Sequence, residues 1–361
     1  MKINILGGGI AGLASAIFLS KQGHEVTIVE RNDYINELGA GIQITPNALR
    51  VLDALGIRND LVNLAEQSTS LSIRRAENSA LLQKVSMHRL VKDKKVGFYH
   101  LHRHKLLNLL KDNAIKNKVK IISNQYINKI IITEDNVRIF SNDIEYDSDI
   151  LIGADGLNSI SRKKLNEDYM PKYSGFCAFR TITTLDESVD KFLYEPNLFL
   201  QKNSHIVTYP LNKNELNCVV VAKQNEQEVE SWNFSSTTKQ VEKSICNFDN
   251  RLQNLFSANS SINKWGLFFH QPKNWFDSRL LIIGDAAHPM LPFMAQGACA
   301  ALEDSLILDY VFKKYNDNFI FKDLNLVFYP ENIYSINGIN SCLLYTSPSQ
   351  RDVEESRMTS S

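Results

Sequence analysis

Residues 2–12 read KINILGGGIAG, and residues 25–30 read EVTIVE. The first five residues of this stretch form an apolar run of strand length, which a glycine cluster follows at once. Ile10–Lys21 then places apolar residues at helical spacing, and Gly23 ends that pattern. Glu25–Glu30 is a second apolar strand. Strand, helix and strand within about 30 residues predict a βαβ unit with a right-handed crossover.

The glycines between the first strand and the helix form the pattern GxGxxG. Gly7 allows a tight turn, Gly9 lets the backbone approach a pyrophosphate, and Gly12 lets the helix pack on the strand. The amides of the helix N-terminus then bind phosphate charge. Glu30, at the end of the second strand, is placed to accept hydrogen bonds from ribose hydroxyls. The opening residues therefore predict a Rossmann-type dinucleotide site.

The composition is that of an ordinary globular protein. The 361 residues are 43% hydrophobic and 22% charged, with a formal net charge of zero. No basic stripe favours nucleic acid, and no apolar run reaches the roughly 20 residues of a membrane span. The five cysteines are far apart and include no CxxC pair, which favours reduced thiols without a zinc site. With no signal peptide in view, we expect a cytoplasmic protein, either a monomer or a homodimer, that binds no metal.

Further along the chain, helical and strand patterns alternate in long blocks. Helices are predicted at Thr45–Leu55, Leu101–Ala114, near 236–256 and at Ala295–Lys314, and strands dominate 172–270. The fold class we predict is α/β, with a discontinuous Rossmann-type nucleotide-binding domain and an inserted β-rich domain. The first domain is expected to comprise 1–72, 97–171 and 270–320, and the second 73–96 and 172–269.

The last twenty residues, 342–361, change composition abruptly and read CLLYTSPSQRDVEESRMTSS. The segment is polar and aperiodic, and it looks like a translated sequencing adapter. We therefore expect a non-native tail that follows a truncated C-terminus.

Two later motifs place an aspartate at the end of a predicted strand. Residues 153–159 read GADGLNS, and residues 284–297 read GDAAHPMLPFMAQG. Ligands of open α/β sheets bind at the carboxyl ends of the strands, so Asp155 and Asp285 are expected at the ligand site. Gln296–Gly297 begins a helix whose positive end is able to face a ring that carries negative charge. Together these motifs favour FAD over NAD as the bound dinucleotide.

With these residues in view, the sequence resembles the class A flavoprotein monooxygenases, the single-component aromatic hydroxylases that include salicylate hydroxylase. The resemblance runs from residue 1 to about 315. It also rests on GAGIQITPNAL at 39–49, HRHKL at 102–106, YPL at 209–211, and Glu303–Asp304. It implies a GR2-like FAD-binding domain, NADH or NADPH as co-substrate, and hydroxylation of a small aromatic by dioxygen through a flavin 4a-hydroperoxide.

The resemblance also implies a set of cofactor contacts. Arg103 and Asp285 are expected to contact FAD, Asp155 to serve both FAD and the nicotinamide donor, and Pro292 to lie beside the isoalloxazine ring with Gln296–Gly297. The whole set of expected cofactor-binding residues is Gly7, Gly9, Ala11, Gly12, Glu30, Arg31, Gly41, Gln43, Arg103, Asp155, Asp285, Pro292, Gln296 and Gly297.

Three residues of the β-rich segment are candidates for substrate contact. His205 and Tyr209 are four residues apart on a predicted strand and project to the same side. His205 is suited to act as a base toward a phenol or to pair with a carboxylate. Arg180 is suited to bind a carboxylate through two hydrogen bonds. The alternatives are that Tyr209 is a packing residue and that Arg180 forms an ion pair between the domains.

The residues leave three alternative functions open. One is a related flavoprotein that epoxidises or reduces an isoprenoid, and another is a non-catalytic FAD-binding protein or inactive fragment. A plain NAD-dependent dehydrogenase is the third, although it leaves the motifs around Asp155 and Asp285 unexplained. His100, His102 and His104 alternate without carboxylates around them, which does not favour a metal site.

Overall fold

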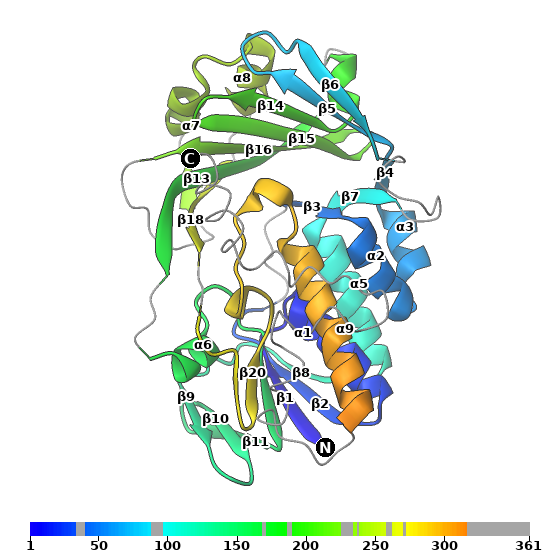
Figure 1. The fold of residues 1–361 in the computed structure, drawn as a ribbon, viewed down its shortest axis with the longest axis vertical. Coiled ribbons are helices and arrows are strands. Elements are labelled where there is room, and N and C mark those ends of the chain that lie inside the picture. The colour runs from blue at the N-terminus through cyan, green and yellow to red at the C-terminus, as the bar shows by residue number, and fades with distance from the viewer. Residues whose placement is uncertain are drawn as a thin grey trace, which may run out of the picture.

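A computed structural model describes residues 1–33, 40–87, 97–167, 171–185, 190–224, 234–236, 238–257, 262–269 and 272–315. The predicted non-native tail at 342–361 lies outside these residues. The described chain forms two lobes, one built on a parallel sheet with helices and one on a large antiparallel sheet (Figure 1).

The first lobe is a sandwich around a six-stranded sheet. Its strands are parallel except for the edge strand β19, as the Rossmann pattern predicts. The strand order is β19 (Phe276–Asp277), β20 (Leu280–Ile282), β12 (Ile150–Gly153), β1 (Lys2–Leu6), β2 (Glu25–Val29) and β8 (Lys120–Ile122). Since β1 connects to β2 on one side and pairs with β12 on the other, the strand order reverses at the carboxyl end of β1.

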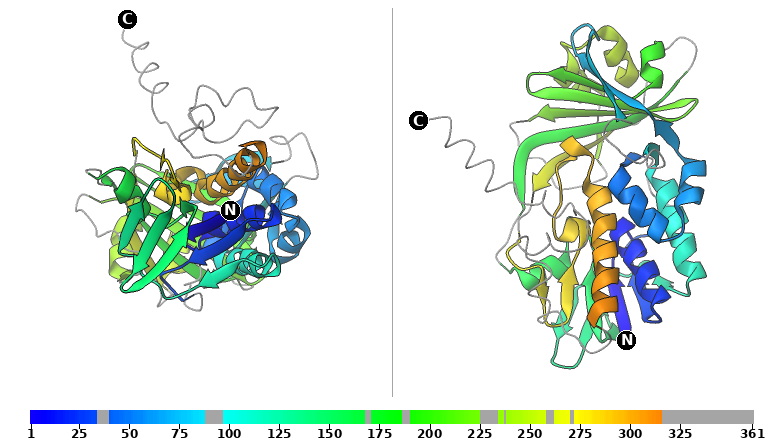
Figure 2. Two further views of the ribbon diagram at one scale, coloured as in Figure 1. Left: turned by 90° about the horizontal axis from the view of Figure 1, so that it is seen from below. Right: turned by 45° about the vertical axis from the view of Figure 1, so that its right-hand side comes forward.

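Helices cover one face of this sheet and a small sheet covers the other. The helices α1 (Ile10–Lys21), α5 (Arg103–Lys116) and α9 (Gly297–Tyr315) share one apolar core with β1 and β12. The first is buried on nearly every side, because α5 and α9 flank it, and the right-hand view of Figure 2 shows α9 running beside α1. On the opposite face lies the antiparallel sheet of β9 (Lys129–Ile132), β10 (Val137–Ser141) and β11 (Ile144–Ser148).

The second lobe is an eight-stranded sheet with two helices on its outer face. All its neighbouring strands are antiparallel except β14 and β5. The order is β17 (Phe234–Ser236), β18 (Ile262–Phe269), β13 (Lys172–Thr184), β16 (Glu215–Lys223), β15 (Ser204–Asn212), β14 (Asn197–Gln201), β5 (Ser70–Arg75) and β6 (Leu81–Ser86). The helices are α7 (Thr238–Ile245) and α8 (Asn250–Ser257), and the short 3-10 helix η2 (Lys191–Tyr194) also lies in this lobe.

Period-two alternation divides the large sheet into an outer and an inner face. Cys177 and Phe179 of β13 and Val220 of β16 pack under α7 and α8 in one apolar cluster. Ala178 and Val221, one residue along, face the other way and belong to a different cluster. The inner face is therefore turned toward the first lobe.

A three-stranded sheet joins the two lobes. It has the order β3 (Gly41–Ile44), β7 (Phe98–His102) and β4 (Glu66–Ser68), all antiparallel. Below it lie α2 (Pro46–Ala54) and α3 (Arg58–Leu64), and α6 (Ile160–Leu165) follows β12 in the first lobe.

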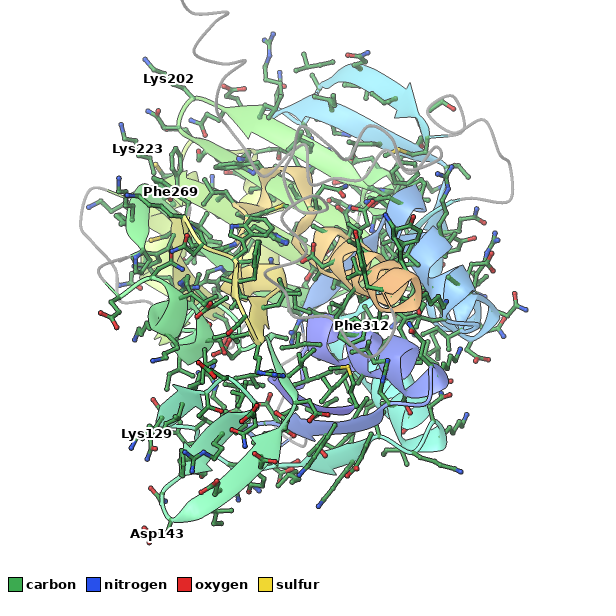
Figure 3. The ribbon with its side chains drawn as sticks, turned by 60° about the horizontal axis from the view of Figure 1, so that its bottom comes forward. Lys129, Asp143, Lys202, Lys223, Phe269 and Phe312 are labelled. Carbon is green, nitrogen blue, oxygen red and sulfur yellow. The ribbon has the colours of Figure 1, made fainter. Side chains whose placement is uncertain are left out.

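Charged side chains mark the two ends of the molecule. Lys202 and Lys223 point outward at the outer end of the large sheet, and Lys129 and Asp143 do so on the β9–β11 sheet (Figure 3). Phe312 of α9, by contrast, is buried against the ring of His24. No helix in the described ranges is long and apolar enough to cross a membrane.

The predicted elements are present with small differences in their bounds. The helix predicted from Leu101 begins at Arg103, because β7 extends to His102. The helical piece near 236–256 is two helices, α7 and α8, rather than one. The division into domains stays a prediction, and its first boundary at residue 72 lies inside β5.

Candidate active site

One large cavity lies where the strand ends of the first lobe meet the inner face of the large sheet. The carboxyl ends of β1, β2, β12 and β20 open on one edge, because these strands are parallel. The cavity has a volume of about 1260 Å³. That exceeds the roughly 300–1,000 Å³ of a drug-sized ligand pocket, so it has room for a dinucleotide together with a small substrate.

The glycine loop after β1 forms one wall of the cavity. Gly7 has a φ of +107°, and a Cβ there would lie 2.3 Å from the carbonyl oxygen of Ala154. A Cβ on Gly12 would lie 2.0 Å from the carbonyl oxygen of Gly7, so Gly12 permits α1 to pack against the turn. Gly12 is the one predicted cofactor residue that does not line the cavity. Gly9 is the N-cap of α1 and meets nothing within 4 Å at its Cβ position, which leaves the helix amides open to a ligand.

Glu30 braces this loop from the end of β2. The amide of Gly8 donates to Oε2 of Glu30 at 2.6 Å, and the amide of Asn32 donates to Oε1 at 2.9 Å. The carboxylate lines the cavity beside Arg31 and keeps further lone pairs for a hydroxyl donor.

Asp155 lies at the cavity but uses its carboxylate on its own loop. Ser159 Oγ donates to one oxygen at 2.6 Å and the amide of Ser161 to the other at 3.1 Å. Burial raises the pKa of Asp155, and these two hydrogen bonds oppose that rise. The structure thus gives the side chain a role in shaping the start of α6, and its contact with a cofactor stays a prediction.

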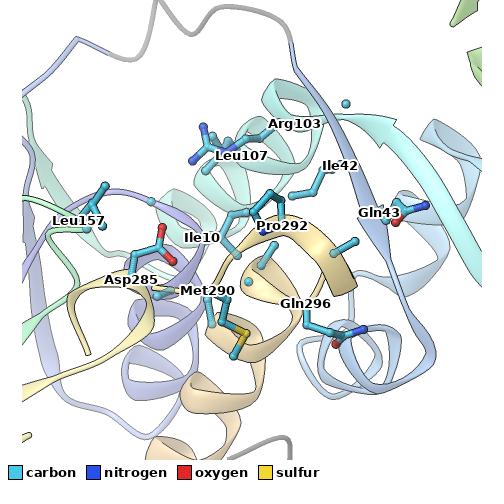
Figure 4. A pocket seen from close by; sticks show the side chains of 18 of the residues that line it. Ile10, Ile42, Gln43, Arg103, Leu107, Leu157, Asp285, Met290, Pro292 and Gln296 are labelled. Atoms are coloured by element: carbon cyan, nitrogen blue, oxygen red, sulfur yellow. The ribbon is translucent and has the colours of Figure 1, made fainter. Parts of the chain in front are cut away.

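Asp285 presents its carboxylate to the cavity from the turn after β20, opposite Arg103 of α5 (Figure 4). Burial raises the pKa of Asp285, while the positive charges of His288 and Arg103 oppose that rise. Arg162 of α6 holds the same turn, donating to the carbonyl oxygens of Ala286 at 3.2 Å and of Leu157. A fixed acceptor and a fixed cation therefore face each other across the cavity.

The segment before α9 forms the floor of the cavity. Pro292 lies in the 3-10 turn η4 (Pro292–Met294), and Gly297 starts α9, so the positive end of this 19-residue helix faces the cavity. The amide of Gln296 is turned toward α2: its oxygen accepts from Asn47 Nδ2 at 3.3 Å, and its nitrogen donates to Thr45 Oγ1 at 3.4 Å.

The strand β3 lies beside this floor. Gly41 and Gln43 line the cavity together, and the amide of Gly41 donates to Asn217 Oδ1 of the large sheet at 2.9 Å. Ala11 of α1 also reaches the cavity, against the turn at Gly284.

The three candidate substrate residues line the same cavity, on the inner face of the large sheet. Arg180 comes from β13, and His205 and Tyr209 come from β15. Alternation along β15 places Val207 between them on the same face, as the four-residue spacing predicts. Apolar side chains fill the rest of this wall: Leu71, Leu198, Val207, Val219 and Val221.

Arg180 is a partly buried cation without a matching anion in the described part of the chain. Burial lowers the pKa of its guanidinium, which packs 4.6 Å from the ring centre of Trp265. Its Nε is buried and has no hydrogen-bond partner, and no described carboxylate forms an ion pair with it. The predicted alternative, an ion pair between the domains, is therefore absent from the described part of the chain.

His205 and Tyr209 differ in their surroundings. The pKa of His205 is lowered by burial, so its imidazole is neutral at pH 7, and its ring lies 5.8 Å from that of Phe293. Tyr209 stacks on His100 with the ring centres 4.7 Å apart, and burial raises the pKa of its hydroxyl to about 12. Tyr209 is thus both a packing residue and a hydroxyl donor at the cavity wall.

Four residues at this site were not predicted from the sequence patterns: His100, Asn217, Trp265 and Phe293. Each reaches the site through the packing of one lobe on the other or of one strand on the next. Local spacing carries no signal for such contacts. For Phe293 alone, its place in the quoted MLPFMAQG segment was a usable signal.

Comparison with known proteins agrees with this geometry. Residues 1–312 match the family model described as FAD binding domain. The chain is 30% identical over 314 residues to 3-hydroxybenzoate 6-hydroxylase of Klebsiella oxytoca, covering 85% of this chain and 79% of that protein. The chain belongs to the class A FAD-dependent aromatic monooxygenases.

Two other similar proteins extend the comparison. A 6-hydroxynicotinate 3-monooxygenase of Pseudomonas fluorescens is 27% identical, covering 85% of this chain and 81% of the relative. A salicylate hydroxylase in complex with substrate superposes with a TM-score of 0.71 at 24% identity, covering 86% of this chain and 78% of that one. The solved structure supports the fold.

Because the chain belongs to the class A monooxygenases, its cofactor is FAD, and its reductant is NAD(P)H as in the rest of the family. The cavity suits FAD on structural grounds, since the loop at Gly7 and Gly9 excludes side chains, α1 offers its amides, and Asp285 faces the interior. The chain is therefore an FAD-dependent monooxygenase that hydroxylates a small aromatic compound. This result favours the aromatic hydroxylase over the isoprenoid, non-catalytic and dehydrogenase alternatives.

Proposed function

We propose that this monooxygenase hydroxylates a phenolic aromatic that carries a carboxylate group, and that Arg180 binds the carboxylate. The observation that carries the proposal is the guanidinium of Arg180 at the cavity wall, whose Nε is buried and which has no carboxylate partner among the described residues. An unpaired buried charge costs several kcal/mol, so a residue in this state is expected to meet an anion from the ligand. The relatives named for 3-hydroxybenzoate and 6-hydroxynicotinate act on aromatic carboxylates that carry a hydroxyl.

Trp265 helps Arg180 to bind a planar anion. Stacking on the indole holds the guanidinium plane in one orientation without using its terminal N–H groups as donors. Those groups then remain for a bidentate pair with a carboxylate, which is the geometry that arginine favours.

His205 is proposed as the base that accepts the phenol proton. A phenolate is a stronger nucleophile than a phenol, and the neutral imidazole of His205 is able to take the proton that must leave. Tyr209, whose pKa is raised to about 12, stays protonated and donates a hydrogen bond to a substrate oxygen. If His205 is the base, kcat/KM falls as pH drops through its pKa, below 6.5, and this acid limb is lost in His205→Gln. A limb unchanged in that variant would exclude His205.

When bound, FAD would supply the redox chemistry: it would accept hydride from NAD(P)H and react with dioxygen. The apolar wall around the substrate has the complementary task of excluding water near the reacting ring. We propose that dioxygen is the source of the inserted oxygen atom, which labelling of the product with ¹⁸O₂ tests. We also propose that the protein is a monomer or a homodimer, which analytical sedimentation tests.

The carboxylate proposal is tested with matched substrates. NADH and NADPH oxidation, together with product formation, would be measured with 3-hydroxybenzoate, with salicylate, and with phenol, which lacks the carboxylate. In Arg180→Gln we expect KM for the carboxylates to rise about 30- to 1,000-fold, the effect of removing one partner of a buried charge pair, while the activity on phenol changes little.

Arg74 provides the control for this test. It lies on β5 of the same sheet, does not line the cavity, and is already 3.8 Å from the carboxylate of Glu195. Arg74→Gln is expected to leave KM unchanged for all three compounds. Equal turnover of phenol and hydroxybenzoates by the wild type, or an unchanged KM in Arg180→Gln, would overturn the substrate class and leave the family assignment intact.

A further inference from the structure

A buried ion pair lies behind the turn that carries Asp285, outside the cavity. His288 Nε2 and Asp304 Oδ2 are 2.6 Å apart, and their side chains are only 5% and 7% exposed. Neither residue lines the cavity. The pair joins the turn after β20 to the second turn of α9, so it links two segments that both reach the cofactor site.

Such a pair is not explained by stability alone. Removing two charges from water costs several kcal/mol for each ion, and buried pairs are often replaced by apolar residues without loss of stability. A further benefit is therefore expected where a protein keeps one, and fixing a particular geometry is one such benefit.

The geometry that Asp304 fixes is that of the turn itself. The same oxygen, Oδ2, accepts a second hydrogen bond, from the amide of Gly284 at 2.8 Å. The amide of His288 in turn donates to the carbonyl oxygen of Gly284 at 2.8 Å. Both ends of the turn are thus tied to one carboxylate oxygen, and Asp285 lies between them.

Asp285 has the opposite orientation. It lines the cavity, and Figure 4 shows its carboxylate pointing toward Ile10 and the interior. Gly284 has a φ of +58°, a backbone conformation that lets the chain reverse direction between the buried amide of Gly284 and the carboxylate of Asp285, which faces the cavity. A carboxylate that accepts a hydrogen bond from a hydroxyl group of FAD increases the affinity for FAD more when its orientation is fixed before binding.

We propose that Asp304 is a positioning residue for FAD, which acts through Gly284 and His288 to hold Asp285 in its binding orientation. Asp304 does not touch the cofactor. Its effect on FAD is transmitted by the backbone of the turn, and it exists only as long as Asp285 is present to be positioned.

The first test is the affinity of the FAD-free protein for FAD, measured by the quenching of flavin fluorescence on titration. Asp304→Ala is expected to raise Kd about 10- to 100-fold, the loss typical when a group that orients a ligating residue is removed. Asp304→Asn keeps an acceptor oxygen in the same place without the charge, and is expected to raise Kd by about 3- to 10-fold.

Asp309→Ala is the matched control. Asp309 lies on the same helix, is 6% exposed, and accepts a hydrogen bond from Gln22 Nε2 at 2.7 Å at the far end of α1. Its removal is expected to lower thermal stability as much as Asp304→Ala does, while Kd for FAD stays within twofold of the wild type.

A double-mutant cycle separates positioning from a general structural effect. Asp285→Ala alone weakens FAD binding, and adding Asp304→Ala to it is expected to weaken binding by less than about threefold. If Asp304→Ala does not fold, Asp304→Asn takes its place in the same cycle. A Kd within twofold of the wild type in the single variant, or an equal loss in both backgrounds, would overturn the proposal.

Discussion

His100 is a titratable residue that the fold keeps neutral. Its side chain is 3% exposed, it stacks on Tyr209, and both ring nitrogens lack a hydrogen-bond partner among the described residues. Burial lowers its pKa to about 3, whereas the unfolded chain takes up a proton near 6.5. Between these two values the unfolded state binds one more proton than the folded state. His100 therefore makes the free energy of unfolding fall as the pH drops below 6.5.

Replacing His100 by phenylalanine keeps an aromatic ring against Tyr209 and removes the titration. We expect the wild type to lose up to about 1.4 kcal/mol of unfolding free energy per pH unit more than His100→Phe between pH 6 and 4. Urea unfolding of both proteins at several pH values measures the difference. Parallel pH profiles would show that His100 is protonated in the folded state, contrary to this account.

The residues that could be predicted from the sequence are those whose roles depend on their neighbours along the chain. Gly7, Gly12 and Glu30 follow from a strand, a turn and a helix in order. The structure places Gly7 and Glu30 at the cavity wall and Gly12 directly behind the turn at Gly7. His100 and Asp304 depend on partners far away in the sequence. Nothing in local spacing shows that β7 packs on β15 or that α9 packs on the turn after β20.

The turn between η4 and α9 contains a strained residue. Ala295 has a φ of +52° and a ψ of +30°, the left-handed region, which costs a residue with a Cβ roughly 1–2 kcal/mol. It lies at the cavity, between Pro292 and Gln296. Strain of this kind persists where the surrounding structure dictates the backbone, here because the chain must turn sharply from the floor of the cavity into α9.

Ala295→Gly is expected to stabilise the protein. Relief of the strain outweighs the entropy that glycine gains in the unfolded state, leaving a gain of about 0.5–1 kcal/mol, which thermal unfolding detects. Ala298→Gly, the same change within the first turn of α9, is the control and is expected to destabilise by about 1 kcal/mol. If both changes shift the melting temperature in the same direction, strain at Ala295 is not the cause.

For helices and strands, the sequence predicts which elements are present better than it predicts where they begin. The hydrophobic pattern indicated a helix from Leu101, but β7 continues to His102, because its residues pair with β3 and β4 before the helix starts at Arg103. The piece near 236–256 divides into α7 and α8 because Phe248 packs into the core between them.

The large sheet is assembled from distant parts of the chain. β5 and β6, from residues 70–86, join strands from 172–269 through a parallel pairing of β5 with β14. Alternation predicts each strand, but not its neighbour, since many registers bury the same apolar face. The expectation from the sequence places residues 73–96 in the second domain, and β6, within that range, does pair with β5 in the large sheet.

The two lobes are in direct contact where Gly41 of β3 meets Asn217 of β16. A Cβ on Gly41 would lie 2.6 Å from Cγ of Asn217, whose side chain is fully buried and accepts the Gly41 amide hydrogen bond. At the edge of the same interface His102 Nε2 lies 3.0 Å from Glu215 Oε2, and that glutamate is 41% exposed. The buried contact at Gly41 therefore limits the distance between the lobes more than the exposed pair does.

Gly41→Ala tests whether this contact holds the lobes in place. The added methyl group meets a side chain that has no room to move, so we expect a loss of about 1–3 kcal/mol in the free energy of unfolding. A Cβ on Gly41 would also lie 2.8 Å from the Cβ of Asn217, so only glycine at position 217 removes every atom in the way. In an Asn217→Gly background the same change is therefore expected to cost less than about 0.5 kcal/mol. Denaturant unfolding of the four proteins in the cycle gives the coupling. Equal costs in the two backgrounds would mean that the methyl group acts on β3 alone, and that the distance between the lobes is set elsewhere.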